Sequence, residues 1–222
     1  MYFRKLLRKL NIVISKLNNS IECETLPEFG NNPKNVRIEL PRKIINPKYI
    51  FLGDNIWIGP GSFIYAITEY PTISMRHPER QQTIQKFTPK IIIGSRVTAT
   101  ANLQIAAMSK IIIEDDVMFA SNINITDGLH GYENANEPYK YQKISNIAPI
   151  LIKKGCWIGQ NVVILPGVTI GEFTIIGANS VVTKSIPDRC IAVGVPAKVI
   201  KKWDETIHRW ISIKDTEVKN DD

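Results

Sequence analysis

The sequence predicts an all-β fold of the solenoid type, in which short parallel strands wind into stacked coils. Three features of residues 150–182 support this prediction: an aliphatic residue at every sixth position, a small or apolar residue two positions before each, and glycine directly after several of them. The aliphatic residues are Ile152, Ile158, Ile164, Ile170, Ile176 and Val182. A helix repeats apolar residues every three or four positions and an isolated strand every two, so neither explains a period of six.

The same spacing occurs earlier in the chain and extends the predicted solenoid domain over residues 36–200. The apolar residues of these earlier hexads are Leu52, Ile58 and Ile64, then Ile93, Ala99 and Ile105, then Ile113, Phe119 and Ile125. A hexad fits one short strand and one corner, with one side chain pointing inward to stack on its equivalent in the next coil. We therefore expect the hydrophobic core to be a column of these side chains.

Residues 1–35 precede the hexads, and we expect a helical or irregular segment there. In "MYFRKLLRKLNIVISKL", Phe3, Leu6, Leu10 and Ile14 share a helical face, while most of the Arg and Lys residues lie off it. Such a stripe most often packs on protein, which is the interpretation we favour. The alternative is a weak contact with an anionic membrane surface. Charges interrupt every apolar run, so the segment does not resemble a signal peptide or a spanning helix.

Two long excursions interrupt the hexads, at residues 68–89 and 126–149. The first reads "TEYPTISMRHPERQQTIQKFTP", and the second begins "TDGLHGYENANEP" and contains one of the three histidines. Long loops in a compact domain are more often functional than idle. We expect these excursions to shape an active site.

Residues 201–222 are predicted to form a C-terminal helix and a tail. In "KKWDETIHRWISI", Trp203, Ile207, Trp210 and Ile211 recur at helical spacing. We expect this helix to close the end of the solenoid or to pack on another subunit.

The composition is that of a soluble globular protein, with 44% hydrophobic and 22% charged residues. The three cysteines form no CxxC pair, which favours a reducing compartment and predicts a cytoplasmic protein. If the N-terminal helix met lipid, the protein would be peripheral at the inner membrane surface. The net charge of +7 favours phosphate-bearing partners. The basic residues are dispersed and form no recognised module, so we do not expect nucleic-acid binding.

Three stretches between residues 152 and 203 carry a family resemblance: "CWIGQNVVILPGVTIG", "IIGANSVVTKSIP" and "VGVPAKVIKKW". They resemble the hexapeptide-repeat acyltransferases, and within them the sugar O-acetyltransferases related to the maltose and galactoside enzymes and to those of bacterial surface polysaccharides. The resemblance covers roughly residues 36–203. It implies a left-handed β-helix, a homotrimer with active sites between adjacent subunits, acetyl-CoA as acetyl donor, and no required metal.

His130 falls where this family places its catalytic histidine, in the excursion after the "IIIEDDVMFASNINIT" coil. A sugar hydroxyl is a poor nucleophile, and an imidazole that titrates near neutrality can remove its proton during attack on a thioester. Asp127 is the candidate for orienting the ring, as the third member of a catalytic triad does. A surface histidine without a role is the competing interpretation, which the position relative to the flanking coils disfavours.

The resemblance also implies a donor site at positions that meet acetyl-CoA in the family. Trp157 would lie along the pantetheine arm, although Trp57 stands in an identical "WIG" context without that role. Gln160 replaces a serine frequent in the family, and Ala178 must be small for close approach to the donor. The other donor-site candidates are Thr183 and three residues near the CoA phosphates, Lys184, Lys198 and Lys201.

The acceptor site departs from the maltose and galactoside pattern. Thr100 stands where those enzymes carry an acceptor-binding asparagine, which argues against a simple maltose-like acceptor. The substrate-binding candidates are Thr100, Asn102, Tyr132, Arg76 and His77. Of these, Arg76 and His77 are available in the first excursion to meet a negatively charged glycan or nucleotide sugar.

We therefore expect an acetyl-CoA-dependent O-acetyltransferase of a sugar hydroxyl, in a surface polysaccharide or its precursor. The alternative is N-acetylation of an amino sugar or xenobiotic on the same fold. A β-helix carbonic anhydrase would need three histidines around zinc, and His208 lies in the C-terminal segment, far from the other two. A catalytically silent scaffold would not be expected to retain the loop histidine and the small Ala178.

Overall fold

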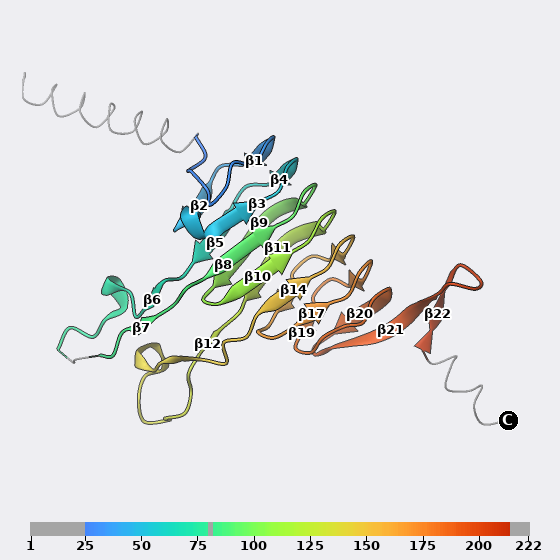
Figure 1. Ribbon diagram of the computed structural model, residues 1–222. Helices are drawn as coiled ribbons and strands as arrows, with labels where there is room; N and C mark the ends of the chain where they lie inside the picture. The colour runs from blue at the N-terminus through green and yellow to red at the C-terminus, as the bar shows by residue number, and fades with distance from the viewer. Residues whose placement is uncertain (1–24, 80–81, 214–222) are drawn as a thin grey trace, which may run out of the picture.

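The computed structural model describes residues 25–79 and 82–213, which form an all-β solenoid, a parallel β-helix. The coils stack along one axis from the blue N-terminal end to the orange C-terminal end (Figure 1). A typical coil contributes three short strands, so the solenoid has three faces joined by three corners. The period of six predicted this arrangement, because one hexad supplies one strand and one corner.

The first face consists of parallel strands paired one coil to the next. They are β1 (Val36–Ile38), β4 (Ile56–Ile58), the first part of β9 (Thr98–Ala107), the first part of β11 (Met118–Thr126), β15 (Trp157–Ile158), β18 (Ile175–Ile176) and β20 (Cys190–Gly194). Their register aligns Trp57, Thr98, Met118 and Trp157 in one row. Both tryptophans of the "WIG" motifs therefore point outward from this face, separated by the intervening coils.

The second face follows the first around a corner that β9 and β11 cross without interruption. Its strands are β2 (Arg42–Ile45), β5 (Ser62–Ala66), the second parts of β9 and β11, β16 (Val163–Ile164) and β19 (Val181–Val182). Because β9 and β11 belong to both faces, the two faces are parts of one 13-stranded sheet, which also includes β21 (Ala197–Asp204) and β22 (Arg209–Ser212).

The third face is a separate 5-stranded sheet. Its strands are β3 (Ile50–Leu52), β8 (Lys90–Ile93), β10 (Lys110–Ile113), β14 (Ile150–Ile152) and β17 (Thr169–Ile170), and the short 3-10 helix η1 (Pro47–Tyr49) precedes β3.

The core is the predicted column of hexad side chains. All six aliphatic residues from Ile152 to Val182 have no exposed surface, and the residues two positions before them are buried as well. Each buried aliphatic side chain contributes roughly 1.5–3 kcal/mol of transfer free energy. The polar residues Thr174 and Ser180 occupy two of these positions, and their hydroxyls hydrogen-bond backbone groups of the neighbouring coil.

The corner between the first and second faces carries an asparagine ladder, which we define as Asn102, Asn122, Asn161 and Asn179. All four adopt left-handed backbone conformations, with φ between 53° and 63°. Neighbouring side-chain amides hydrogen-bond one another across the coils at 2.8, 3.0 and 2.9 Å. Asparagine tolerates this conformation better than most residues, which explains its recurrence at the tight corner.

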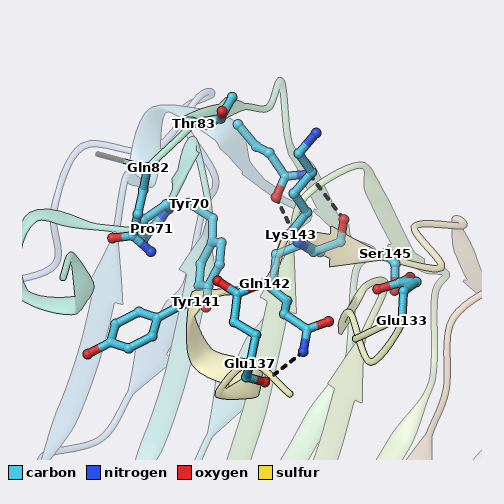
Figure 2. A pocket seen from close by; sticks show the side chains of 12 residues that line it. Tyr70, Pro71, Gln82, Thr83, Glu133, Glu137, Tyr141, Gln142, Lys143 and Ser145 are labelled. Atoms are coloured by element: carbon cyan, nitrogen blue, oxygen red, sulfur yellow. Dashed lines mark hydrogen bonds between the residues drawn. The ribbon is translucent and has the colours of Figure 1, made fainter. Parts of the chain in front are cut away.

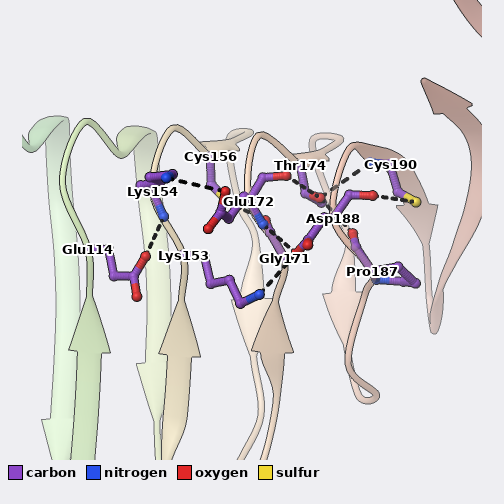
Figure 3. Close-up of polar contacts among 10 residues, drawn as sticks. All are labelled: Glu114, Lys153, Lys154, Cys156, Gly171, Glu172, Thr174, Pro187, Asp188 and Cys190. Carbon is purple, nitrogen blue, oxygen red and sulfur yellow. Dashed lines mark hydrogen bonds and ion pairs between the residues drawn. The ribbon is translucent and has the colours of Figure 1, made fainter. Parts of the chain in front are cut away.

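The corner between the third and first faces is held by polar contacts between successive coils (Figure 3). Lys153 Nζ lies 3.1 Å from Asp188 Oδ1, and that same oxygen accepts the backbone N–H of Glu172 at 2.9 Å. The backbone hydrogen bond and the lysine lower the pKa of Asp188. This corner also requires left-handed residues, and Phe173 and Arg189 fill that place without glycine or asparagine.

Both excursions leave the solenoid at the corner between the second and third faces. The first contains β6 (Glu69–Tyr70), η2 (Ile73–Met75) and β7 (Gln85–Lys86). The second contains β12 (Leu129–His130), η3 (Tyr139–Tyr141) and β13 (Ile144–Ser145). Within each excursion the two strands pair antiparallel, and both hairpins project from the same side of the molecule (Figure 1).

The prediction of a C-terminal helix is wrong. The chain instead forms an antiparallel hairpin of β21 (Ala197–Asp204) and β22 (Arg209–Ser212), with β21 paired to β20. Trp203 and Trp210 face each other across the hairpin, with ring centroids 5.5 Å apart. Asp204 stabilises the turn by accepting the backbone N–H groups of Thr206 and Ile207. Cross-strand pairing therefore explains an apolar spacing that also fits a helix.

The predicted N-terminal helix lies outside the described residues. In the part of the chain that is described, no helix is long and apolar enough to cross a membrane.

Candidate active site

His130 lies on β12, outside the aliphatic core. Its Cα partner in the antiparallel pair is Ile144 of β13, and its side chain is exposed while that of Ile144 is buried. Gly131, the next residue, donates its N–H to the carbonyl of Lys143 at 2.7 Å. A Cβ at Gly131 would lie 2.6 Å from that same carbonyl oxygen. The close approach of the two strands therefore requires glycine beside the histidine.

Tyr70 of the first excursion contacts the imidazole of His130. Its Oη lies 3.1 Å from Nδ1, and the two ring centroids are 5.2 Å apart in an edge-on arrangement. The same hydroxyl donates a hydrogen bond to the carbonyl of Lys140. Tyr70 is 5% exposed and packs with Met108 and Ile144 in a small core separate from that of the solenoid. This burial raises the pKa of the Tyr70 phenol, which keeps it protonated at neutral pH.

Gln85 of β7 connects the two excursions through the backbone of β13. Its Nε2 donates to the carbonyl of Ile144 at 3.1 Å, and its Oε1 accepts the Ile144 N–H at 2.7 Å. The rings of His77 and Tyr141 add a contact with centroids 5.0 Å apart. The two excursions, 60 residues apart in the sequence, therefore form one structural unit around His130.

A cleft of about 560 Å³ lies between the two excursions (Figure 2). Tyr70, Gln85 and Ile144 border it, so the groups that surround His130 also line the cleft. Its volume is within the roughly 300–1,000 Å³ of small-molecule sites. Two lining residues, Gln82 and Ser145, each have a buried side-chain atom without a hydrogen-bond partner, Nε2 and Oγ respectively.

The carboxylate of Asp127 hydrogen-bonds backbone groups rather than the imidazole of His130. Asp127 has no exposed surface, and its carboxylate accepts the backbone N–H groups of Met108 at 2.7 Å and Ser109 at 2.8 Å. Desolvation raises its pKa, and these hydrogen bonds partly oppose that rise. The carboxylate thus stabilises the corner at which the second excursion starts. The group that contacts the imidazole of His130 is the Tyr70 hydroxyl instead.

The predicted acceptor residues of the excursions lie in different surroundings. Arg76 contacts Glu69 at 3.4 Å, so part of its charge is used within the first excursion. His77 accepts the backbone N–H of Glu79 and packs on Tyr141. Tyr132 is 68% exposed, two residues after His130.

Thr100 and Asn102 lie at the corner between the first and second faces, at the far end of the second face from His130. The amide of Asn102 belongs to the asparagine ladder, and the Thr100 hydroxyl lies 3.5 Å from the carbonyl of Phe119. Within one chain these two residues do not meet His130.

The predicted donor residues are distributed over three places. Thr183 and Lys184 follow β19 at the end of the second face, the corner from which the His130 excursion starts. Gln160 and Ala178 lie beside the asparagine ladder, and their side chains are exposed. The remaining three lie on the first face or its extension: Trp157 on β15, and Lys198 and Lys201 on β21. The first face is opposite the His130 corner, with the aliphatic core between them.

The described residues contain no group of three or more His, Cys, Asp or Glu placed to hold a metal ion.

Sequence reasoning missed Tyr70 and Gln85. Both lie in the first excursion, where no hexad fixes their direction, and their partners are about 60 residues away. The only available signal was the presence of a second long excursion from an equivalent corner.

The comparisons with known proteins agree with this architecture. The family model described as "Bacterial transferase hexapeptide (six repeats)" matches residues 149–184. The galactoside O-acetyltransferase of Escherichia coli K12 is 30% identical over 190 residues, which cover 81% of this chain and 82% of that protein. WbbJ of the same strain, named for O-acetyl transfer in lipopolysaccharide biosynthesis, is 34% identical over 126 residues. This match covers 54% of this chain and 64% of the length of WbbJ.

Among solved structures, a galactoside acetyltransferase in complex with coenzyme A has a TM-score of 0.51 and 28% sequence identity. The match covers 80% of this chain and 67% of that chain.

Proposed function

Because this chain belongs to the bacterial hexapeptide-repeat transferases, we propose that it transfers the acetyl group of acetyl-CoA to a sugar hydroxyl, with His130 as the general base. The observation that carries the proposal is an exposed histidine, held on a hairpin outside the core beside a cleft. It supports the proposal because the proton of a hydroxyl must be removed where acceptor and donor can meet. The coenzyme A bound to the related acetyltransferase structure supports the choice of donor.

The proposed reaction depends on His130 carrying one proton from the acceptor hydroxyl to the leaving group. His130 removes the acceptor hydroxyl proton while the oxygen attacks the thioester carbon. The new C–O bond forms, the C–S bond of the donor breaks, and the imidazolium returns the proton to the departing CoA thiolate. Each cycle leaves the protein unchanged and releases an acetylated acceptor and free CoA.

The acceptor we propose is a hydroxyl of a bacterial surface polysaccharide or its precursor. The similarity to WbbJ supports this class, and the departure at Thr100 from the maltose and galactoside pattern is consistent with it. The same proton transfer would serve an amine, so N-acetylation of an amino sugar is the alternative.

The assembly we propose is a homotrimer with active sites between subunits. Its support is geometric: Trp157 lies on the first face and His130 projects from the opposite corner of the same chain. One chain cannot line a single groove with both, whereas a neighbouring subunit can supply the missing wall. The left-handed winding, the three-part division at residues 35 and 200 and the cytoplasmic location belong to the same proposal. For the N-terminal segment, which precedes the described residues, we propose packing on protein, with weak contact to an anionic membrane surface as the alternative.

The experiment that tests the function is an acceptor screen. Purified protein is incubated with acetyl-CoA and neutral oligosaccharides, amino sugars, nucleotide sugars or acidic glycans, while thiol release and product mass are followed. We expect thiol release with a mass increase on a hydroxyl of a glycan. An alkali-stable acetamide product would favour the N-acetyl alternative, and no acceptor-dependent thiol release with any class would refute the proposal.

A further inference from the structure

We infer that Tyr70 is a positioning residue for His130, which fixes the imidazole as the tautomer with its proton on Nδ1 and a bare Nε2. This inference rests on the proposed function only in naming Nε2 as the proton-accepting atom; the tautomer itself is a property of the protein without substrate. It gives the first excursion, 68–89, a role in the reaction.

The direction of the two hydrogen bonds follows from counting protons. The Tyr70 hydroxyl has one proton, and the Lys140 carbonyl can only accept, so that proton goes to Lys140. The Tyr70 oxygen then has only lone pairs for the second contact. It must therefore accept a hydrogen bond from His130, whose Nδ1 lies 3.1 Å away.

The consequence for His130 is a fixed tautomer. A neutral imidazole carries one N–H, and the hydrogen bond of one nitrogen decides which nitrogen holds it. With the proton on Nδ1, the lone pair lies on Nε2, at the side of the ring away from Tyr70. That is the nitrogen that can accept the proton of an acceptor hydroxyl.

The position of Tyr70 is itself fixed by packing and by both excursions. Tyr70 is 5% exposed and packs against Met108 and Ile144, and Gln85 hydrogen-bonds both backbone groups of Ile144. Its hydroxyl contacts both His130 on β12 and the carbonyl of Lys140 on η3, and so connects two parts of the second excursion. Asp127, the alternative partner, is occupied by the backbone N–H groups of Met108 and Ser109.

The first test reads the tautomer directly. Nitrogen-15 NMR of histidine-labelled protein distinguishes N–H from bare ring nitrogens, and His77→Gln and His208→Gln variants assign the signals. At a pH where the ring is neutral, we expect wild-type His130 to show a protonated Nδ1 and a bare Nε2. In Tyr70→Phe, which keeps the ring but removes the hydroxyl, a substantial population should move to the Nε2–H tautomer. Tyr139→Phe, on the exposed surface of the second excursion, is the matched control and should leave the tautomer unchanged.

The second test is kinetic. Tyr70→Phe should lower kcat by about 10-fold, because a ring free to exchange tautomers still spends part of its time in the productive form; a fully wrong tautomer in a serine protease triad costs ~10⁴-fold. The KM for acetyl-CoA should change less than twofold. An Nε2–H tautomer in the wild type, or an unchanged kcat in Tyr70→Phe, would overturn the inference and leave the proposed function intact. Full activity of a His130→Ala variant would instead overturn the proposed function, whatever the tautomer.

Discussion

The residue on which the proposed chemistry depends is His130, which stands outside the core, where a substrate can reach it. We predict that His130→Ala lowers turnover of the acetylated acceptor by ~10²-fold or more, the scale of general base catalysis. Acetyl-CoA affinity should change little, because the imidazole acts on the acceptor proton. Steady-state kinetics with isothermal titration of acetyl-CoA checks both.

The other two histidines are the controls for this variant. His77→Ala and His208→Ala should keep the chemical step, although His77→Ala can raise the KM of an acceptor bound in the cleft, since His77 packs on the cleft residue Tyr141. Wild-type turnover in a folded His130→Ala protein would mean that the excursion covers the acceptor without acting on it.

Burial of the side chain should determine how fast the thiols of Cys156 and Cys190 react with an alkylating reagent. Cys156 is 1% exposed, and desolvation raises its pKa to about 11; burial also raises the pKa of Cys190. At pH 8 we predict that both resist iodoacetamide in the native protein and react fully in denaturant, because a thiolate is the nucleophile. Peptide mass spectrometry measures the modification, and rapid native labelling of Cys156 would contradict its burial.

The sequence predicted the place of His130, because the hexads on both sides show where the chain leaves the solenoid. It could not predict the partner of the ring. Asp127 is three residues from His130, which suggests contact, but the carboxylate turns inward to the backbone of residues 108 and 109. Tyr70 makes the contact from the other excursion, and no spacing rule connects the two positions.

Among the elements, the asparagine ladder tests how the first corner is held. Asn122→Ala should destabilise the protein by about 1–3 kcal/mol, because alanine in a left-handed conformation costs roughly 1–2 kcal/mol and two side-chain hydrogen bonds are lost. Asn122→Gly loses the same hydrogen bonds but accepts the conformation, so its thermal midpoint should fall between those of the wild type and the alanine variant. If the alanine variant were as stable as the glycine variant, the left-handed conformation at position 122 would carry no cost for alanine, which would contradict the prediction.

The two excursions should act as one element through Gln85. Gln85→Ala removes both hydrogen bonds to the backbone of Ile144, the Cα partner of His130. We predict that the amide of Ile144 exchanges its hydrogen about 10-fold faster, as expected for a loss near 1.4 kcal/mol, and that turnover falls while the thermal midpoint changes little. Hydrogen-exchange mass spectrometry and kinetics check this prediction.

The matched control is Gln104→Ala. Gln104 is an exposed glutamine of the second face, and within the described ranges its side chain hydrogen-bonds that of Asn124, which is also exposed. Equal effects of the two variants would contradict a specific role of Gln85.

The elements that the sequence predicted best are those with one repeated environment. Every hexad strand buries the same kind of side chain against the same kind of neighbour, so its period is visible along the chain. The C-terminal segment has no such repetition. Trp203 and Trp210 are seven residues apart, a spacing that fits one face of a helix and also a cross-strand pair, and pairing with β20 decides for the hairpin.

At the scale of the whole molecule, the three-faced solenoid separates the residues proposed to act together. The first face carries Trp157, and the opposite corner carries the excursion with His130. The hydrophobic core between them is one continuous cluster of buried side chains, which separates the two places within the described chain. If His130 and Trp157 act at one site, as proposed, that site needs two chains, and we predict that light scattering reports a trimer.

An activity assay of trimers with mixed subunits tests this arrangement more directly than a molecular mass from light scattering does. We predict that Trp157→Ala weakens acetyl-CoA binding through loss of apolar contact, whereas Trp57→Ala, in the same row of the first face, does not. His130→Ala and Trp157→Ala trimers should each be impaired at subsaturating acetyl-CoA. After the two proteins are unfolded together, refolded and assayed, some sites should combine an intact His130 from one chain with an intact Trp157 from another, and activity should exceed the average of the two parents. If both residues of a site came from the same chain, every site in the mixture would carry one lesion and activity would not rise above that average.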